Sequence, residues 1–217
     1  MNKGNLIIIS GPSGSGKDEV LKRLFKKKSN IGFSISSVTR NMREGEVEGE
    51  KYNFISVEKF KSMIDNDEFL EYNEYCGNFY GTPKTPVIKS IENGVDIVLE
   101  VDVNGAENIR KNFKDAVSVF IIPPSFAELK RRLVGRGTES AEVIEKRLSE
   151  AIGEISRANE YDYIVVNDKI DEAVDNIITI INSERFKYKN QEKILNEVLK
   201  NVKPINRKTY QPLRQQI

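Results

Sequence analysis

The residues best suited to do chemistry in this chain lie in a glycine loop near its N-terminus. Gly11, Gly16 and Lys17 fill the spacing G-x-x-x-x-G-K at the end of the apolar run in LIIISGPSGSGK. Glycines let backbone N–H groups turn inward around an anion, and a following helix adds the positive end of its dipole. Lys17 would then reach the terminal phosphates as a point charge. A strand pattern before the loop and a helix pattern after it favour a phosphate-binding loop over an ordinary glycine-rich turn.

The loop departs from the usual motif at its last position. Ser or Thr normally follows the lysine and binds Mg²⁺ through its hydroxyl, whereas this chain has Asp18 followed by Glu19. A carboxylate at this place is able to hold Mg²⁺ through a water molecule. It is equally able to repel polyphosphate, because two charges about 4 Å apart interact by ~4 kcal/mol at an effective dielectric of about 20. The sequence leaves both outcomes open.

A second group of candidate residues lies between positions 36 and 82. Arg40 and Arg43 stand among hydroxyl residues, and guanidinium forks bind a phosphate dianion bidentately, although taken alone they also fit a solvated basic turn. Glu71 lies near hydroxyl residues, where a carboxylate is able to accept from a ring N–H and an exocyclic amine, the donor edge of guanine. The hydroxyl of Tyr52 is able to add a donor to phosphate. The alternative for the other aromatic residues is that they form the core of a small subdomain: Tyr72, Tyr75, Phe79 and Tyr80.

Two further groups carry charge. Glu100 and Asp102 end an apolar strand, and because unpaired buried carboxylates are costly, we expect them at the mouth of a site, beside a cation or substrate donors. The alternative for Asp102 is that it caps the next helix. Arginines near a glycine-bounded break suit a lid that closes over polyphosphate: Arg131, Arg132, Arg136 and Arg147. Arg136, between two glycines, fits that role best, whereas Arg132 and Lys130 are expected to be solvated.

The composition narrows the possible chemistry. The chain has 217 residues, a formal net charge of +1, a single cysteine, Cys76, and no histidine. The absence of histidine excludes histidine general bases and histidine-ligated metals, and the near-zero net charge predicts neither nucleic-acid nor membrane binding. One cysteine permits no intramolecular disulfide, which is compatible with a cytoplasmic location. The apolar runs are shorter than a signal peptide or a membrane span requires.

The elements that must position these residues alternate between buried strands and helices. Strands are predicted over 5–10, 95–101, 117–122 and 163–166, and helices over 17–28, 57–64, 104–112, 125–134, 140–157 and 170–186. This order predicts a parallel sheet covered on both faces, with ligands at the carboxyl ends of its strands. Ser125 and Glu128 have the spacing of a capping box. The polar segment beyond 187 is expected to hold one helix near 192–199 and a disordered tail.

Taken together, these segments resemble the guanylate kinase family. The matching segments occur in family order over about residues 5–185: ISGPSGSGK, FSISSVTRNMREGEVEGEKYNF, NDEFLEYNEYCGNFYGTP, VLEVDVNGA, FIIPPS, RLVGRGTES and YIVVND. The resemblance implies an α/β fold of the P-loop nucleoside monophosphate kinases, with a core at 1–33, 86–124 and 151–187, a GMP-binding insertion at 34–85, a lid at 125–150 and a partly disordered extension at 188–217. It implies transfer of the γ-phosphoryl group of ATP to GMP with Mg²⁺ by a monomer or homodimer that binds ATP and GMP, with no nucleic acid or membrane as partner.

The resemblance also implies roles by matching position. ATP would be bound by the loop and by Asn167, which lies where the family approaches adenine; the loop residues are Gly11, Pro12, Ser13, Gly14, Ser15, Gly16, Lys17 and Asp18. Asp18 is also the candidate metal residue, through water. The GMP phosphate would be bound by Arg40, Arg43, Tyr52 and Tyr80, and the guanine by Ser36, Glu71, Thr82 and Asp102. The implied catalytic residues are Lys17, Arg40, Arg136 and Arg147.

Two alternatives stay open at this point. A related kinase would act on another phosphorylated acceptor, which the matches at Glu71 and Tyr80 disfavour. A non-catalytic guanylate-kinase-like module would lack a working ATP loop, which Lys17 and the intact glycines disfavour. Asp18 and Glu19 are the feature that keeps this second alternative open.

Overall fold

The computed structural model describes residues 3–75, 77–135 and 141–200. Three features singled out in the sequence lie outside these ranges: the lid arginine Arg136, the lone Cys76 and the tail from 201 to 217.

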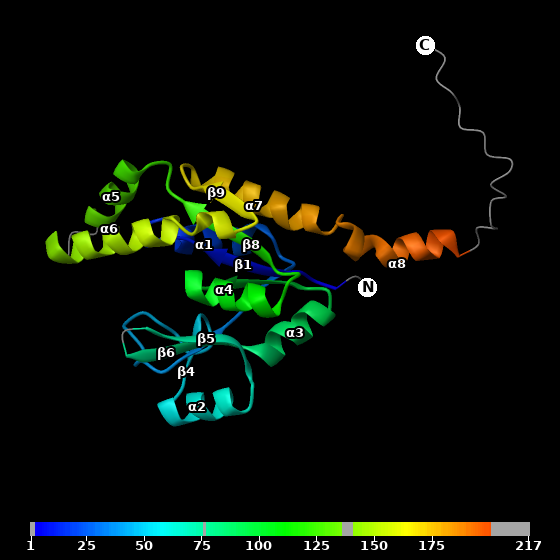
Figure 1. The fold of residues 1–217 in the computed structure, drawn as a ribbon, viewed down its shortest axis with the longest axis horizontal. Coiled ribbons are helices and arrows are strands. Elements are labelled where there is room, and N and C mark those ends of the chain that lie inside the picture. The colour runs from blue at the N-terminus through cyan, green and yellow to red at the C-terminus, as the bar shows by residue number, and fades with distance from the viewer. Residues whose placement is uncertain (1–2, 76, 136–140, 201–217) are drawn as a thin grey trace, which may run out of the picture.

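A five-stranded parallel sheet forms the centre of the molecule (Figure 1). Its pairings are all parallel, and β1 is buried along its whole length, as expected for a central strand covered on both faces. The predicted fold class is therefore confirmed. In spatial order the strands are β2 at Ile31–Phe33, β7 at Asp96–Glu100, β1 at Leu6–Ser10, β8 at Val117–Ile122 and β9 at Tyr163–Val166.

Helices cover both faces of this sheet because side chains alternate along each strand. Ile7 and Ile9 of β1 pack with apolar residues of α1 and α7 on one face. Leu6 and Ile8 pack with α3 and α4 on the other. The covering helices are α1 at Lys17–Lys27, α3 at Lys84–Glu92, α4 at Val103–Asn112 and α7 at Ile170–Glu184.

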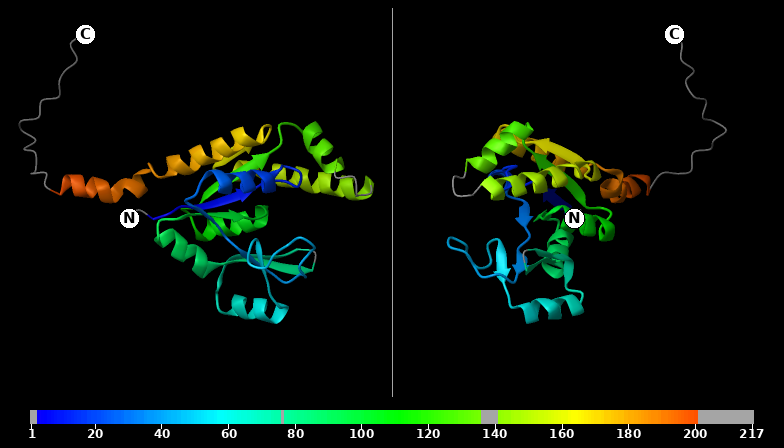
Figure 2. Two further views of the ribbon diagram at one scale, coloured as in Figure 1. Left: turned by 180° about the vertical axis from the view of Figure 1, so that it is seen from behind. Right: turned by 60° about the vertical axis from the view of Figure 1, so that its left-hand side comes forward.

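A second, four-stranded sheet lies apart from the first and carries α2 on its outer side (Figures 1 and 2). Phe60 of α2 stacks on Phe69 and Phe79, with ring centroids 4.5 and 5.4 Å away, so part of the aromatic segment does form a small core. Tyr72 is 45% exposed and lies at the edge of this core, where its ring contacts those of Phe60 and Phe69. The elements are β4 at Tyr52–Phe54, β3 at Ser36–Val38, β6 at Asn78–Pro83, β5 at Phe69–Tyr75 and α2 at Val57–Asp65.

Two helices near the phosphate loop, α5 (Phe126–Val134) and α6 (Ala141–Ile155), pack together through Leu129, Leu133 and Ala151. Ser125 caps α5 as predicted, because its hydroxyl accepts from the backbone N–H of Glu128 at 3.1 Å. The Glu128 carboxylate, however, accepts from two arginines one turn further along rather than completing a capping box. Guanidinium groups supply charged donors at this spacing, and these are stronger partners than a backbone N–H.

The C-terminal helix α8 spans Tyr188–Leu199, so it begins earlier than the predicted start near residue 192. Asn190 and Gln191 extend its first turn by donating to the carbonyl oxygens of Glu184 and Arg185 at the end of α7. The helix projects away from the central sheet (Figure 2), and none of its residues is buried. Within the described residues, no helix combines the length and the apolar character needed to cross a membrane.

Candidate active site

The phosphate loop joins β1 to α1, and its glycines are required by its backbone. Gly14 and Gly16 have φ angles of 86° and 81°, a region that residues with a side chain rarely adopt. Gly16 is the N-cap of α1, and a Cβ there would lie 2.5 Å from Nδ2 of Asn167. The Pro12 carbonyl accepts from the Ser15 N–H at 3.0 Å and closes the turn. The loop therefore presents the unpaired amides at the start of α1 to an anion.

Two side chains hold this loop from outside. Asn167 donates from Nδ2 to the carbonyl oxygen of Ser15 at 2.8 Å, and Arg132 donates from Nη1 to the same oxygen at 3.3 Å. Arg132 also donates to the Asn167 carbonyl at 2.9 Å and to the Glu128 carboxylate at 2.7 Å. The prediction that Arg132 is a solvated side chain is therefore wrong, since only 21% of it is exposed. The i,i+4 spacing from Glu128 is the one sequence feature that indicated a fixed guanidinium.

An open hollow of about 700 Å³ lies beside the loop. Gly16 and Ser125 line it together with Arg132 and Asn167, and its volume is typical of ligand pockets, which span roughly 300–1,000 Å³. The hollow is placed to receive the remainder of a ligand whose phosphates lie in the loop.

Four charged side chains form a chain of ion pairs beside the loop. Lys17 Nζ lies 3.4 Å from the Gly11 carbonyl oxygen and 3.6 Å from Glu100 Oε1. Lys51 Nζ lies 2.9 Å from Glu100 Oε2 and 2.9 Å from Asp18 Oδ1. Burial alone would lower the pKa of Lys51, but the two carboxylates outweigh it and raise that pKa. The structure thus places Glu100 beside cations, as predicted, and adds Lys51, which was not predicted.

Helix α6 reaches the loop through an arginine. Arg147 donates from Nη2 to Oγ of Ser13 at 2.6 Å. A guanidinium at this place adds positive charge next to the position where the terminal phosphates of a bound nucleotide would lie. Arg136, which was expected to act with Arg147, lies outside the described residues.

A second polar centre is built around Glu71 on β5. Its side chain is buried, and the hydroxyl of Thr82 donates to Oε1 at 2.7 Å. Burial raises the pKa of Glu71 to about 7; the bond from Thr82 opposes this rise and the nearby Asp102 carboxylate adds to it. A Cβ on Gly105 would lie 3.0 Å from Glu71 Oε2, so the first turn of α4 closes over the carboxylate. Three residues that were expected to recognise a base therefore lie close together here: Glu71, Thr82 and Asp102.

Asp102 caps the next helix, which is one of the two alternatives that the sequence left open for it. Its Oδ1 accepts from the Gly105 N–H at 2.7 Å and caps α4. Its Oδ2 accepts from Nδ2 of Asn73 at 2.6 Å, which ties the cap to β5 of the second sheet. Capping of α4 thus places the Asp102 carboxylate next to the Glu71 centre.

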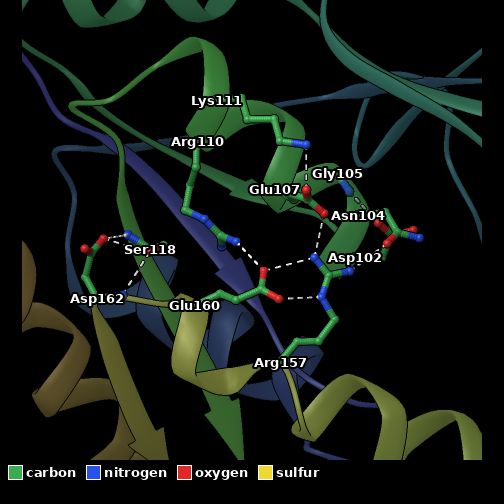
Figure 3. Close-up of polar contacts among 10 residues, drawn as sticks. All are labelled: Asp102, Asn104, Gly105, Glu107, Arg110, Lys111, Ser118, Arg157, Glu160 and Asp162. Atoms are coloured by element: carbon green, nitrogen blue, oxygen red, sulfur yellow. Dashed lines mark hydrogen bonds and ion pairs between the residues drawn. The ribbon is translucent and has the colours of Figure 1, made fainter.

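A hydrogen-bonded cluster near Asp102 joins α4 to the segment that follows α6 (Figure 3). Arg157, which follows α6, donates to Asn104 at 2.8 Å, to Glu107 at 2.7 Å and to Glu160 at 2.8 Å. Arg110 of α4 donates to the same Glu160 carboxylate at 2.8 Å. The end of α6 and the start of α4 are therefore held together, which connects the arginine-bearing helix to the Glu71 centre.

Arg40 lies in the second sheet region with its guanidinium already oriented. It donates from Nη1 and Nη2 to the two oxygens of Glu46 at 2.6 and 2.5 Å, and these bonds lower the pKa of Glu46 to about 2. Its Cζ atom lies 5.2 Å from the centroid of the Tyr52 ring, and the rings of Tyr52 and Tyr80 lie 6.3 Å apart. The side chain of Arg43 is exposed to solvent, and its backbone N–H donates to the Glu46 carboxylate at 2.8 Å.

The residues predicted from the sequence thus fall into two groups, one at the phosphate loop and one around the second sheet, which Asp102 meets from the start of α4. Ser36 belongs to the second group, because it is in register with Tyr52 across β3 and β4. Three hydrogen-bond partners of predicted residues were not themselves predicted from the sequence: Glu46, Lys51 and Asn73.

Comparison with known proteins adds independent findings. The family model described as guanylate kinase matches residues 3–184, which ends before α8. A guanylate kinase of Clostridium tetani is 47% identical over 185 residues, covering 85% of this chain and 88% of that protein. One of Oceanobacillus iheyensis is 48% identical over 185 residues, covering 85% and 90%. The crystal structure of guanylate kinase from Anaplasma phagocytophilum aligns with a TM-score of 0.77 at 32% identity, covering 94% of this chain and 98% of that one.

Proposed function

Since the chain belongs to the guanylate kinase family and, as an enzyme of that family, transfers the γ-phosphoryl group of ATP to GMP, we propose a role for each part of the site. In this proposal the phosphate loop binds ATP, the second sheet binds GMP, and α5 with α6 forms the lid. The observation that best supports this division is a lysine-bearing phosphate loop combined with a separate, buried Glu71–Thr82 centre.

The Glu71 centre supplies the selectivity for guanine in this proposal. An ionised carboxylate accepts from the ring N–H and the exocyclic amine of guanine together, and Ser36, Thr82 and Asp102 complete the pocket. Adenine presents a ring acceptor where guanine presents a donor. A site built around buried acceptors rejects a ligand that leaves those acceptors unpaired.

Phosphoryl transfer itself needs no general base, because the acceptor is already an anionic phosphate. An oxygen of the GMP phosphate attacks the γ-phosphorus, the bond to the β-phosphate oxygen breaks, and ADP leaves with the electron pair. The chain contributes by positioning and charge neutralisation. Lys17 and the loop amides hold the ATP phosphates, Arg40 and Arg43 hold the GMP phosphate, and Arg147 with Arg136 closes over the transferring group.

Mg²⁺ fits this site as an ion that enters with ATP. Among the described residues, no group of three or more His, Cys, Asp or Glu side chains forms a metal cage. Mg²⁺ commonly keeps several waters and binds one or two carboxylates together with substrate phosphates, and the Asp18 carboxylate, 72% exposed, suits that role. When bound, the ion would neutralise charge on the terminal phosphates.

A coupled assay tests the substrate assignment. Purified protein is expected to form ADP and GDP from ATP and GMP in the presence of Mg²⁺, and EDTA should abolish the turnover. AMP should be used at least ~10²-fold less efficiently than GMP, because it leaves the Glu71 carboxylate unpaired. Equal use of AMP and GMP would contradict the role given to Glu71.

The pH dependence of GMP binding tests the same carboxylate. The pKa of Glu71 is raised to about 7, so GMP, which needs the ionised form, should bind more weakly as the pH falls through that value. Without GMP, the same shift makes the unfolding free energy decrease as the pH rises from about 4.5 to about 7. The phosphate of GMP titrates near pH 6 as well.

Glu71→Gln is the matched control. The phosphate of GMP titrates in the same way with this variant, whereas the side chain at position 71 no longer titrates. Dissociation constants measured by calorimetry at a series of pH values should change less in this variant than in the parent protein. Parallel curves for the two proteins would show that Glu71 does not titrate in GMP binding.

A further inference from the structure

The acid at the end of the phosphate loop lies where polyphosphate would bind, and a lysine from the second sheet region covers it. Lys51 precedes the first residue of β4, yet its ammonium bridges Asp18 and Glu100 at 2.9 Å from each. We propose that Lys51 is a positioning residue for ATP: it neutralises Asp18 and Glu100 and so leaves Lys17 available to the phosphates. This inference rests on the proposed assignment of the loop as the ATP site.

The distances rank the two lysines as partners of Glu100. Lys51 lies 2.9 Å from one carboxylate oxygen, whereas Lys17 lies 3.6 Å from the other. The Glu100 side chain is only 12% exposed, so water screens its charge poorly. Without Lys51, this carboxylate would attract Lys17 more strongly and would compete with a phosphate for its ammonium.

Asp18 is the second acid that needs the positive charge of Lys51. Its carboxylate follows directly after Lys17, in the first turn of α1, where the helix dipole and the loop amides attract anions. A bound polyphosphate would meet this negative charge at close range. The contact of 2.9 Å between Lys51 Nζ and Asp18 Oδ1 pairs this acid with a positive charge.

The position of Lys51 argues against a role in holding GMP. Its ammonium lies 5.9 Å from the centroid of the Tyr52 ring, but both of its carboxylate partners belong to the central sheet and α1. Lys51 therefore extends from the GMP-binding region toward the ATP loop, and its loss should act on ATP rather than on GMP.

A single variant and a double variant test this mechanism. Lys51→Met keeps the length of the side chain and removes its charge, and we expect it to raise the dissociation constant of Mg²⁺-free ATP, measured by calorimetry in EDTA, about tenfold. The dissociation constant of GMP should change less than about threefold. Adding Asp18→Ser to Lys51→Met removes one of the uncompensated acids, and this double variant should recover most of the ATP affinity. Steady-state assays should show the loss in KM for ATP.

Lys61→Met, at an exposed lysine of α2, is the matched control and should bind both nucleotides as the parent does. Unchanged ATP binding in Lys51→Met would overturn the inference. So would a double variant as weak as Lys51→Met, since Lys51 would then act on ATP without Asp18, and so would equal losses for ATP and GMP. Lys17→Ala separates the two levels: if it too binds ATP normally, the assignment of the loop fails, whereas a loss confined to Lys17→Ala removes only the role of Lys51.

Discussion

Replacing Lys17 with alanine is expected to lower kcat/KM for ATP by about 10³-fold or more while the protein stays folded. The Lys17 ammonium lies at the mouth of the phosphate loop, 3.4 Å from the Gly11 carbonyl oxygen, with 20% of the side chain exposed. The negative charge that develops between the β- and γ-phosphates would then no longer be neutralised by the Lys17 ammonium. Folding should survive, because Glu100 keeps Lys51 as an ion-pair partner.

Lys22→Ala is the control for this experiment, since Lys22 lies exposed on the same helix. Steady-state kinetics and thermal unfolding should be measured on both variants. A Lys17→Ala enzyme within about tenfold of the parent in kcat/KM, a difference of only ~1.4 kcal/mol in activation free energy, would remove Lys17 from the catalytic group.

Replacing Arg40 with alanine is expected to raise KM for GMP and to lower kcat, with a combined loss of about 10²–10³-fold in kcat/KM for GMP. The guanidinium is held in place by Glu46 and lies over the ring of Tyr52, so it is fixed before GMP arrives. A planar fork that is already oriented binds a phosphate dianion with little further loss of entropy. Binding of ATP alone should remain close to that of the parent protein.

Arg40→Lys separates charge from geometry. It keeps one positive charge but lacks the fork, so its activity should fall between those of the parent and Arg40→Ala. Arg23→Ala, an exposed arginine on α1, controls for a general effect of removing a guanidinium. GMP kinetics close to the parent in Arg40→Ala would disprove the phosphate role, and ATP binding weakened as much as GMP binding would indicate a wider structural defect.

The sequence by itself determined four strands of the central sheet and the phosphate loop, whereas the edge strand β2 was not predicted. Apolar β-branched runs such as that of β1 have one favourable place in an α/β protein, inside a sheet covered on both faces. The loop is equally local, because its positive φ angles at Gly14 and Gly16 depend on residues within one short segment. Residues at strand ends, such as Asp102 and Asn167, could be assigned to one edge of the sheet from strand order alone.

The tertiary structure alone decided which charges from separate elements meet. Lys51 is 33 positions from Asp18, and Arg132 is 117 positions from Ser15, so no local spacing connects the members of either pair. Local patterns depend on backbone conformations that a few neighbouring residues fix, whereas an ion pair depends on where two separate elements pack. For this reason the sequence left open whether the acid after Lys17 would hold Mg²⁺ or repel polyphosphate, whereas the fold places Lys51 beside it as a counter-charge.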